Sequence, residues 1–513
     1  MTSARRRTAA VIGATALAVL GGACSPAGSS SPPGGAKAFV VARTGDIDKL
    51  DPHQATAFQT VETLALVYDT LVTTTADGKL APGLATSWEV SNGGRTVTFA
   101  LRHPVTWQDG DPFTAADVKA SLSRILNPRT GAVASSNLNQ IRSIGTPGPH
   151  TVVLQLSSPD QSLLYELALL NAAILHTKDI QAGTVGKRPD GTGPFAWKSW
   201  NPGQQVTLTA NRHYWGSPPK IGTLEFRVIP SESSILSGMR ARAFQMGLVS
   251  DPAIAQQATG SSSFRLVKEP SLSYHVLQLN GARGPLRNQQ VRQAIACAIN
   301  RQQVVSTAAF GDGKVTGPIT SPSFQYSPAA GLPCTPGDTN AARQMLVRAG
   351  YPNGFSLSTI VETGEYATSV SEGQNLQSQL LKIGVRLNLQ QLTTAPYVQA
   401  WLAADYDAAV ALNGGNYDPY LMYGRYFTAG ASLAKPAGIT SSTLNALLAQ
   451  GNSTGNEAAR HQIYGQLQQA LLRESPWVWT FQGDDYYLVG GTVNGFTPRP
   501  DEQLTGLASA SAG

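Results

Sequence analysis

The sequence predicts an α/β protein, and three observations along the chain lead to that class. The first half holds short segments in which apolar and polar residues alternate, a pattern typical of half-buried strands. From about residue 286, helical periodicity alternates with strand-like pieces, which predicts a second α/β unit. The chain then returns to an aromatic, strand-like segment at 477–489, unlike the helix before it.

The first 37 residues have the composition of an export signal followed by a tether. An arginine triplet at 5–7 precedes an apolar or small-residue run over 9–20, which is too short for a bilayer span of about 20 residues. Cys24 follows the small residues 21–23 and resembles the acylated cysteine of bacterial lipoproteins. Gly21, however, stands where that pattern has Leu or Val.

We therefore expect a signal peptide over 1–23, a flexible tether rich in Ser, Pro and Gly over 24–37, and a lipid anchor at Cys24. The alternative is an ordinary signal cleaved near 16–18, with Cys24 incidental. Either interpretation places the mature protein outside the cytoplasm.

Charge and length exclude some classes of function. Without the arginine triplet, 35 of the 38 Lys and Arg residues remain against 32 Asp and Glu residues, and no dense basic run follows. This balance does not indicate nucleic-acid binding. Close to 490 residues after the signal are enough for two or three domains.

Cys297 and Cys334 are the other two cysteines of the chain. Outside the cytoplasm a leftover pair of cysteines more often forms a disulfide than stays reduced. Cys297 falls in a helical run and Cys334 in a loop flanked by prolines, so the sequence predicts a bridge between a helix and a loop. Two buried, unreactive thiols are the alternative.

Four strands and one helix are expected in the first half. The helix is indicated by Thr114 and Asp117, which have the spacing of a capping box before the apolar positions of 118–125. The alternating apolar residues of the strands are Val97, Phe99 and Leu101; Val152, Leu154 and Leu156; Val206 and Leu208; and Leu224, Phe226 and Val228.

Helices and strands alternate in the second half. Strands are expected over 355–360, 385–389 and 408–412. The apolar faces of the helices are Val291, Ile295 and Ile299; Ala342, Leu346 and Ala349; Leu376, Leu380 and Ile383; and Ile463, Leu467 and Leu471.

Motifs for catalysis or metal binding are weak. The segment 451–455 reads GNSTG and matches the nucleophile elbow of hydrolases, but a helical run precedes it where the elbow needs a strand. We interpret it as a helix end, with Ser453 or Thr454 as a cap. The seven histidines include no pair at zinc-ligand spacing, and Asp484-Asp485 reads as a solvated turn. We expect no enzyme activity, no metal and no cofactor.

A series of longer segments is more specific. It closely resembles the family 5 extracellular solute-binding proteins, the peptide- and nickel-type receptors of ABC importers, and it covers nearly the whole mature chain in order. The segments are LDP at 50–52, VYDTLV at 67–72, LAPGLATSWEV at 80–90, TFALR at 98–102, WQDGDPFTAADV at 107–118, GTGPF at 191–195, NRHYW at 211–215, VRQAI at 291–295, AINR at 298–301 and AGYP at 349–352.

The resemblance implies a two-lobed α/β fold of the periplasmic-binding-protein type, with a small additional domain inserted in lobe one. The return to strand-like sequence near residue 477 then marks the crossing back to lobe one. The implied boundaries are lobe one at 38–77, 191–275 and 480–507, the inserted domain at 78–190, lobe two at 276–479, and a tail at 508–513.

The resemblance also implies a function. A monomeric, lipid-anchored receptor on the extracytoplasmic face of the membrane would capture a peptide or other small polar solute between its lobes and deliver it to the permease of an ABC importer. Hinges are expected near residues 274–275 and 481. The alternatives are a secreted hydrolase, for which the sequence offers no nucleophile–base pair, and a sensing or scaffolding lipoprotein on the same fold.

One departure from the family pattern bears on the chemistry of the cargo. Peptide-binding members carry Asp-x-x-Asp/Glu-Pro, whose first acid holds the free amine of the peptide. Here the matching stretch ends in Asp418-Pro419, but Gly415 stands at the position of that acid. Either Asp405, Asp407 or Asp418 substitutes, or the cargo has no free amine; we favour the second interpretation. The residues expected in the cleft are Phe58, Gln59, Tyr274, Trp401, Asn413, Asn416, Tyr417, Asp418 and Arg425.

Overall fold

The computed structural model describes residues 38–324, 326–364 and 367–513. Its main feature is a ten-stranded mixed sheet with the strand order β14-β13-β15-β12-β16-β11-β1-β10-β9-β8. Separate hydrophobic clusters lie along this sheet, and they define two lobes and a small domain. Cys24 and the rest of the expected signal and tether lie outside the described residues.

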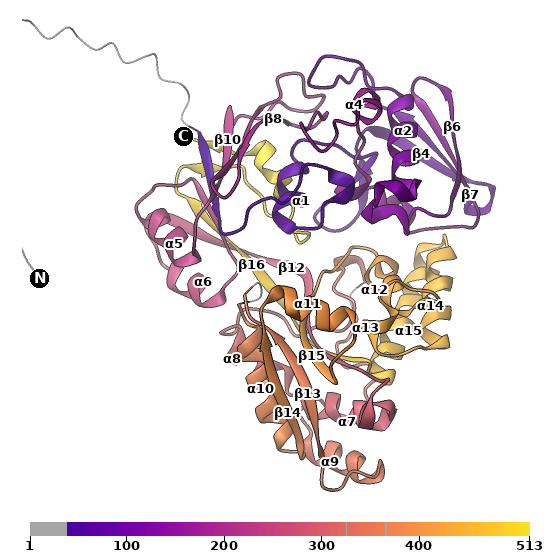
Figure 1. The fold of residues 1–513 in the computed structure, drawn as a ribbon, viewed down its shortest axis with the longest axis vertical. Coiled ribbons are helices and arrows are strands. Elements are labelled where there is room, and N and C mark those ends of the chain that lie inside the picture. The colour runs from indigo at the N-terminus through magenta and orange to yellow at the C-terminus, as the bar shows by residue number, and fades with distance from the viewer. Residues whose placement is uncertain (1–37, 325, 365–366) are drawn as a thin grey trace, which may run out of the picture. The chain divides into compact units, whose positions relative to one another are not determined.

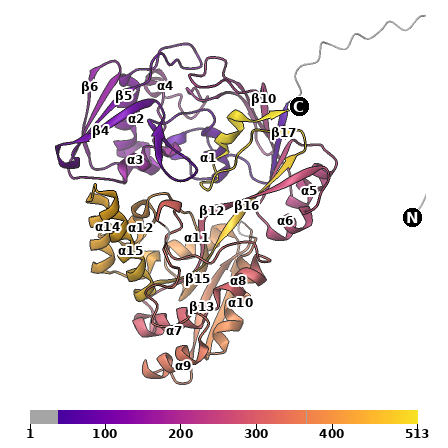
Figure 2. The same cartoon turned by 180° about the vertical axis from the view of Figure 1, so that it is seen from behind.

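Two long antiparallel strands, β12 (Phe264–Leu279) and β16 (Trp477–Gly490), belong to both lobes. The first part of β12 pairs with the last part of β16, and the last part of β12 pairs with the first part of β16. The register shifts between Pro270 and Tyr274, where the pair crosses from one lobe to the other. Figure 1 and, from behind, Figure 2 show both strands running between the two bodies.

Lobe one packs around the parallel pair β1 and β10 and around the segment that follows β16. Its buried residues form two clusters, one of them under α5 and α6. The elements are β1 (Phe39–Arg43), α1 (Phe58–Leu64), α4 (Thr177–Ala182), β8 (Phe195–Asn201), β9 (Gln205–Ala210), β10 (Thr223–Val228), α5 (Glu232–Arg240), β11 (Met246–Val249), α6 (Pro252–Ala258), β17 (Val493–Asn494) and β18 (Ser511–Ala512).

The small domain is a four-stranded antiparallel sheet, β4-β5-β7-β6, with helix α2 on it. Helix α2 begins with the predicted capping box, because Thr114 Oγ1 accepts from the Ala116 N–H and Asp117 Oδ2 accepts from the Thr114 N–H. The elements are β2 (Val72–Thr74), β3 (Leu80–Pro82), β4 (Ala85–Ser91), β5 (Thr96–Leu101), α2 (Ala115–Leu126), β6 (Ile141–Gly148), β7 (Thr151–Leu156) and α3 (Leu163–Glu166).

In lobe two, helices pack on the parallel strands β13 and β14 and also on the shared strands β12 and β16. Cys297 on α7 and Cys334 in the loop before α9 form a disulfide. The elements are α7 (Gln289–Ala298), α8 (Arg301–Ala308), α9 (Thr339–Arg348), β13 (Phe355–Glu362), α10 (Ser369–Leu381), β14 (Val385–Leu392), α11 (Thr394–Leu402), β15 (Ala408–Asn413), α12 (Pro419–Phe427), α13 (Ala434–Ala437), α14 (Ser442–Ser453) and α15 (Glu457–Glu474).

The predicted strands and helices are confirmed in type, with one difference at the C-terminal strand. Asp484 and Asp485 do not form a solvated turn, because β16 continues through both residues and pairs with β12 there. Segment 451–455 ends α14 without forming an elbow, with Thr454 as the C-cap, and Asn456 is the N-cap of the next helix. Among the described residues, no helix combines the length and apolar character that crossing a membrane requires.

Candidate ligand-binding cleft

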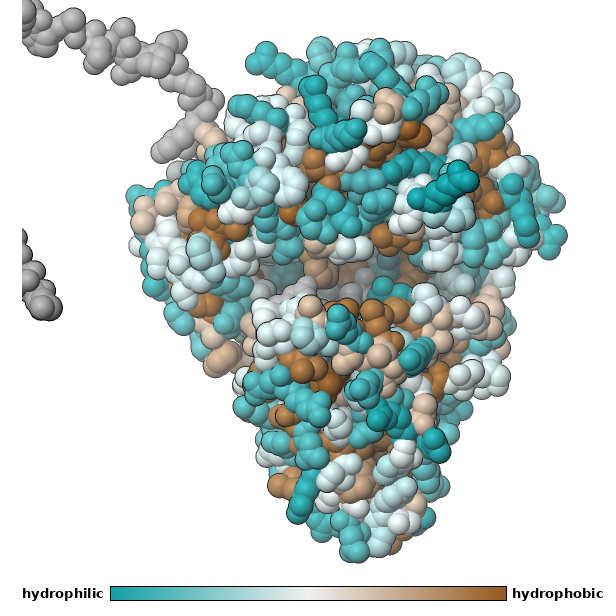
Figure 3. Space-filling view, viewed as in Figure 1, coloured by the Kyte–Doolittle hydropathy of each residue, from teal (hydrophilic) through white to brown (hydrophobic). Residues whose placement is uncertain are grey.

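A cavity of about 640 Å³ lies where β12 and β16 cross between the lobes. Lobe one contributes residues from β1, α1, α5 and α6 to its wall, and lobe two contributes residues beside α8 and α10. Figure 3 shows the surface hollowed between the two lobes. The volume is within the range of about 300–1,000 Å³ that is typical of pockets for small ligands.

Helix α1 places three side chains on the cavity wall. Phe58, Gln59 and Glu62 line the cavity from neighbouring positions of one helical face, since residues one turn apart lie above each other. Phe58 is 43% exposed and lines the cavity, so a ligand there can reach its ring. Phe58 and Gln59, two of the residues expected in the cleft, thus both line the cavity.

Arg43, at the end of β1, is a buried cation beside α1. Its Nη1 donates to the Thr63 hydroxyl at 3.0 Å and to the Gln59 carbonyl at 3.2 Å, and it lies 3.5 Å from Glu62 Oε2. Its Nε and Nη2 are buried without a hydrogen-bond partner among the described residues. Burial lowers the pKa of Arg43, against the raising effect of Glu62.

Three carboxylates meet on the lobe-one side of the cavity: Glu62 from α1, Asp485 from β16 and Glu502 from the C-terminal segment. Burial raises the pKa of Glu62 to about 7, although Arg43 opposes the shift. Burial, followed by repulsion from Glu502 and Glu62, raises the pKa of Asp485 well above its ordinary value. The sequence does not indicate that these three residues belong to one site, because they come from distant segments with no shared motif.

Glu502 is held in place by its surroundings. Its Oε1 accepts from the Ser271 hydroxyl at 2.6 Å and from the Ser273 hydroxyl at 2.9 Å, at the point where β12 crosses between the lobes. Its backbone has a φ of 61°, in the left-handed region that residues other than glycine seldom adopt. Strained backbones of this kind persist where the surrounding contacts fix them, often at functional sites.

The lobe-two wall is apolar and hydrogen-bonded. His275 and Phe481 both line the cavity, and their rings stack with centroids 4.1 Å apart. His275 Nδ1 lies 2.8 Å from the buried Glu372 Oε1, which fixes the orientation of the imidazole. Lys268 and Asp312, 2.7 Å apart, bridge β12 to the loop after α8.

Asp418 has a structural role in place of the predicted contact with the ligand. It is fully buried, accepts from the N–H groups of Tyr420 and Leu421 as the cap of α12, and forms an ion pair with Arg460. Asn416 in turn accepts from the Asp418 N–H at 3.0 Å. Neither side chain lines the cavity.

The other predicted cleft residues also lie away from the cavity wall. Tyr274, 1% exposed, packs against Tyr423, and Asn413 is buried opposite it across the β12–β15 pair. Tyr417 is 4% exposed, and its carbonyl accepts from the Ser321 hydroxyl. Trp401 donates to Gln278 at 2.6 Å, and the exposed Arg425 lies over the Tyr426 ring. Tyr274, Asn413 and Tyr417 serve packing because their side chains are turned toward the core, whereas Arg425 faces solvent.

Gly415 has no room for a side chain. A Cβ atom there would lie 1.9 Å from the carbonyl oxygen of Leu272, so an acid cannot occupy this position without moving the backbone. Asp405 and Asp407, two of the possible substitutes, pair instead with Arg283 away from the cavity. The family acid therefore has no counterpart in this loop.

A set of hydrogen bonds away from the cavity joins the small domain to lobe two. Asn452 Nδ2 donates to Asp160 Oδ1 at 3.0 Å, and Asn452 Oδ1 accepts from the Ser162 N–H at 2.9 Å. The Gln161 N–H also donates to the Asn452 carbonyl at 2.8 Å. Asp160 and Asn452 are both buried, so the contact excludes water. We call this set of bonds the interlobe contact.

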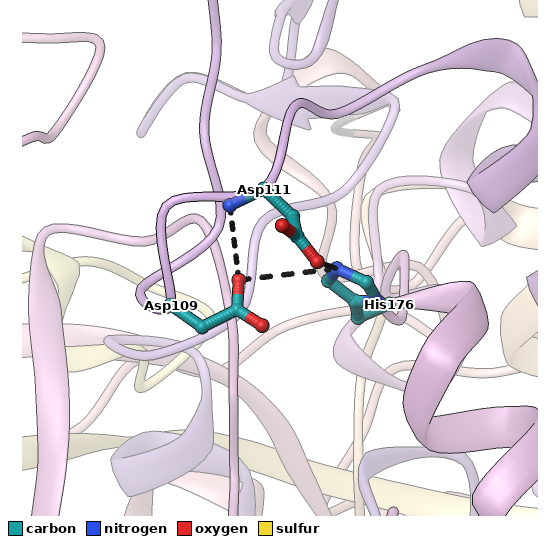
Figure 4. A group of neighbouring side chains, drawn as sticks. All are labelled: Asp109, Asp111 and His176. Carbon is teal, nitrogen blue, oxygen red and sulfur yellow. Dashed lines mark hydrogen bonds and ion pairs between the residues drawn. The ribbon is translucent and has the colours of Figure 1, made fainter.

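Asp109, Asp111 and His176 place ligand atoms within 4.8 Å of one another, as a metal site would require (Figure 4). However, His176 Nδ1 accepts from the Lys178 N–H at 3.0 Å, so in the neutral imidazole Nε2 carries the proton and faces the carboxylates. Lys178 Nζ already lies 2.8 Å from Asp109. The group is better explained as an ion-pair cluster around Lys178 than as a metal centre.

Comparison with known proteins identifies the family. The model described as "Bacterial extracellular solute-binding proteins, family 5 Middle" matches residues 79–433. The chain belongs to this family. The resemblance in the sequence motifs is thereby confirmed, and the chain is a solute-binding protein of the ABC-importer type, a class that acts outside the cytoplasm.

The curated relatives are binding proteins as well. The glutathione-binding protein GsiB of Salmonella typhimurium is 26% identical over 486 residues, covering 90% of this chain and 92% of that protein. GsiB of Escherichia coli K12 is also 26% identical, covering 86% and 88%. None of these matches is to an enzyme.

Solved structures confirm the two-lobed fold. The binding protein AgaA of A. tumefaciens R10, in complex with agropinic acid, has a TM-score of 0.80 and 27% identity over 93% of this chain and 99% of that one. A dipeptide-binding protein of Pseudoalteromonas sp. SM9913 with Met-Leu has a TM-score of 0.81 at 22% identity, covering 93% and 100%. At that identity the second match shows the fold alone.

Proposed function

We propose that the mature protein is a lipid-anchored receptor that captures a small polar solute in the cleft and delivers it to the permease of an ABC importer. The observation that carries the proposal is the cavity of about 640 Å³, which both lobes line at the point where they are joined. A ligand that contacts both lobes stabilises the closed arrangement, because only that arrangement provides both sets of contacts.

The proposed hinge is the strand crossing. Ser271 and Ser273 of β12 and Gly483 of β16 lie at the register shift and line the cavity. A change of backbone angles over these few residues would open the lobes and leave each hydrophobic cluster intact, as hinge closure requires. The interlobe contact at Asn452 would then form only on closure.

The N-terminal anchor completes the proposal. Acylation of Cys24 would hold the receptor beside its permease, and residues 24–37 would give it reach. A Cys24→Ser variant is expected to leave the membrane fraction, and unchanged retention in that fraction would reject the anchor. The printed names of two relatives, a glutathione-binding protein and a binding protein in complex with agropinic acid, support a small polar solute as the cargo.

The test is a thermal-shift screen with di- to pentapeptides, amino acids, polyamines and sugars. A solute that binds the native state raises the melting temperature in proportion to the logarithm of its excess over Kd. We expect stabilisation by a narrow set of solutes, with each solute recovered unchanged by mass spectrometry. Conversion of a bound solute to product, or stabilisation by none of the panel, would contradict a receptor for such solutes.

A further inference from the structure

The cleft carries a strong excess of negative charge. Seven carboxylates line the cavity against one arginine, Arg43, and no lysine. Four of the seven already have partners or lie beside a cation: Glu232 accepts from backbone N–H groups, Asp251 caps α6, Asp312 pairs with Lys268, and Asp484 lies beside that pair.

The remaining three are Glu62, Asp485 and Glu502, and a single cation, Arg43, lies beside them in the cavity wall. Arg43 pairs with Glu62 alone. Glu502 has only the two serine hydroxyls, and Asp485 Oδ2 is buried with no hydrogen-bond partner in the described part of the chain. An ionised carboxylate that is shielded from water is costly unless a cation or hydrogen-bond donors reach it. These carboxylate oxygens can therefore still accept hydrogen bonds from a ligand.

Building on the proposed function, we propose that the cleft selects solutes that carry a protonated amine or guanidinium, and that Glu62, Asp485 and Glu502 hold this cation. The site replaces the family acid, whose position is closed at Gly415 by the Leu272 carbonyl. The expectation from sequence of a cargo without a free amine rested on that loop alone. The structure supplies acids for the same task from α1, β16 and the C-terminal segment.

The chemistry favours an organic cation over a metal ion. In the described part of the chain, the group whose ligand atoms converge within 4.8 Å is Asp109, Asp111 and His176, not these three carboxylates. More widely spaced oxygens suit an ammonium or guanidinium, which donates several hydrogen bonds in different directions. The open ring of Phe58 on the same wall adds an aromatic face, which attracts such cations.

The test compares charged and neutral forms of the same probe by calorimetry. The probes are unblocked di- to pentapeptides, their N-acetylated forms, putrescine and spermidine. The variants are Asp485→Asn, Glu502→Gln and their combination, since Gln can still accept from Ser271 and Ser273. We expect binding of at least one cationic probe, loss of at least tenfold on acetylation, and at least tenfold weaker binding by each variant.

Asp405→Asn is the matched control, because this carboxylate is exposed and pairs with Arg283 away from the cavity. It should change affinity less than twofold, and thermal unfolding should show that every variant folds. Equal binding of acetylated and free probes, equal binding by the variants, or binding of no cationic probe would each overturn the cation site. Stabilisation by a neutral sugar alone would overturn it and leave the proposed receptor function standing.

Discussion

At the scale of single residues, the cleft holds like charges close together. Glu62, Asp485 and Glu502 repel one another and are half-buried, and both effects disfavour their ionised forms. The protein offsets part of this cost with Arg43 and with two serine hydroxyls. A bound cation would offset the remaining cost. Ligand affinity and proton binding by these carboxylates therefore depend on the same electrostatic repulsion.

The first prediction concerns the stability of the ligand-free protein. The pKa of Glu62 is raised to about 7 in the folded state, from an ordinary value of 4.5. Between these values the folded state binds the proton more tightly than the unfolded state, so the free energy of unfolding falls as the pH rises. Arg43, Glu502 and Asp485 face Glu62 and set the size of the effect.

Chemical denaturation at intervals from pH 4.5 to 7.5 measures this slope. Glu62→Gln should make it shallower, whereas Glu89→Gln, at an exposed position on β4, serves as the matched control. A slope that is the same in the wild type and Glu62→Gln would show that Glu62 does not titrate in this window.

Sequence patterns predict side chains on a regular face better than side chains from several segments. Phe58 and Gln59 both line the cavity because one short helix presents them. Two adjacent acids are typical of a solvated turn, and only the pairing of β16 with β12 shows that Asp485 is half-buried in a strand. Asp418 lies away from the cavity because it caps α12 and pairs with Arg460, and this ion pair depends on a segment some 40 residues away.

At the scale of elements, local periodicity in the sequence predicts the helices and strands, but it does not predict how the strands pair. The capping box of α2 and the alternating strands β5, β7, β9 and β10 follow from the sequence. The order of the ten-stranded sheet does not, because β1 lies between β10 and β11, and β16 pairs with β11 and β12, which precede it by about 200 residues or more. Such pairing depends on tertiary packing, which local pattern does not contain.

The second prediction concerns the disulfide. Cys297 is buried in the core of lobe two, and the bridge to Cys334 closes a sequence separation of 37 residues. Restricting a loop of this length in the unfolded chain stabilises the native state by about 4 kcal/mol. The double variant Cys297→Ala/Cys334→Ala should therefore unfold at clearly lower temperature.

Thiol titration of the denatured, unreduced protein is the companion measurement. It should find no free thiol at these two positions. Two free thiols, or an unchanged melting temperature in the double variant, would contradict the bridge in the mature protein.

The third prediction concerns the interlobe contact. Asn452→Ala removes two buried side-chain hydrogen bonds to the small domain, together worth about 1–2 kcal/mol. If they form on closure, ligand affinity should fall roughly 5- to 30-fold although residue 452 lines no part of the cavity. Ser453→Ala is the control, since its exposed hydroxyl bonds within α14.

Calorimetry gives the affinity, and small-angle scattering gives the compactness with and without ligand. An Asn452→Ala protein with wild-type affinity and wild-type compaction would assign the contact to both the open and closed arrangements.

At the scale of the whole molecule, the fold joins capture to conformational change. The two lobes share β12 and β16, and the proposed hinge in these strands lies next to the proposed cation site, since Asp485 is two residues from Gly483. Ser271 and Ser273 bond Glu502 at the crossing, so a cation bound there acts directly on the segment that must bend. Family resemblance predicted two lobes and a cleft; the identity of its charged wall required the three-dimensional arrangement.

Native mass spectrometry of the protein as purified tests the central claim most directly. The account predicts a non-covalent complex with one solute per chain, whose mass and fragmentation show a basic nitrogen, and which leaves unchanged when the protein unfolds. The Asp485→Asn/Glu502→Gln variant should retain much less of it. A retained solute without any basic nitrogen, or an adduct that survives unfolding, would contradict the account.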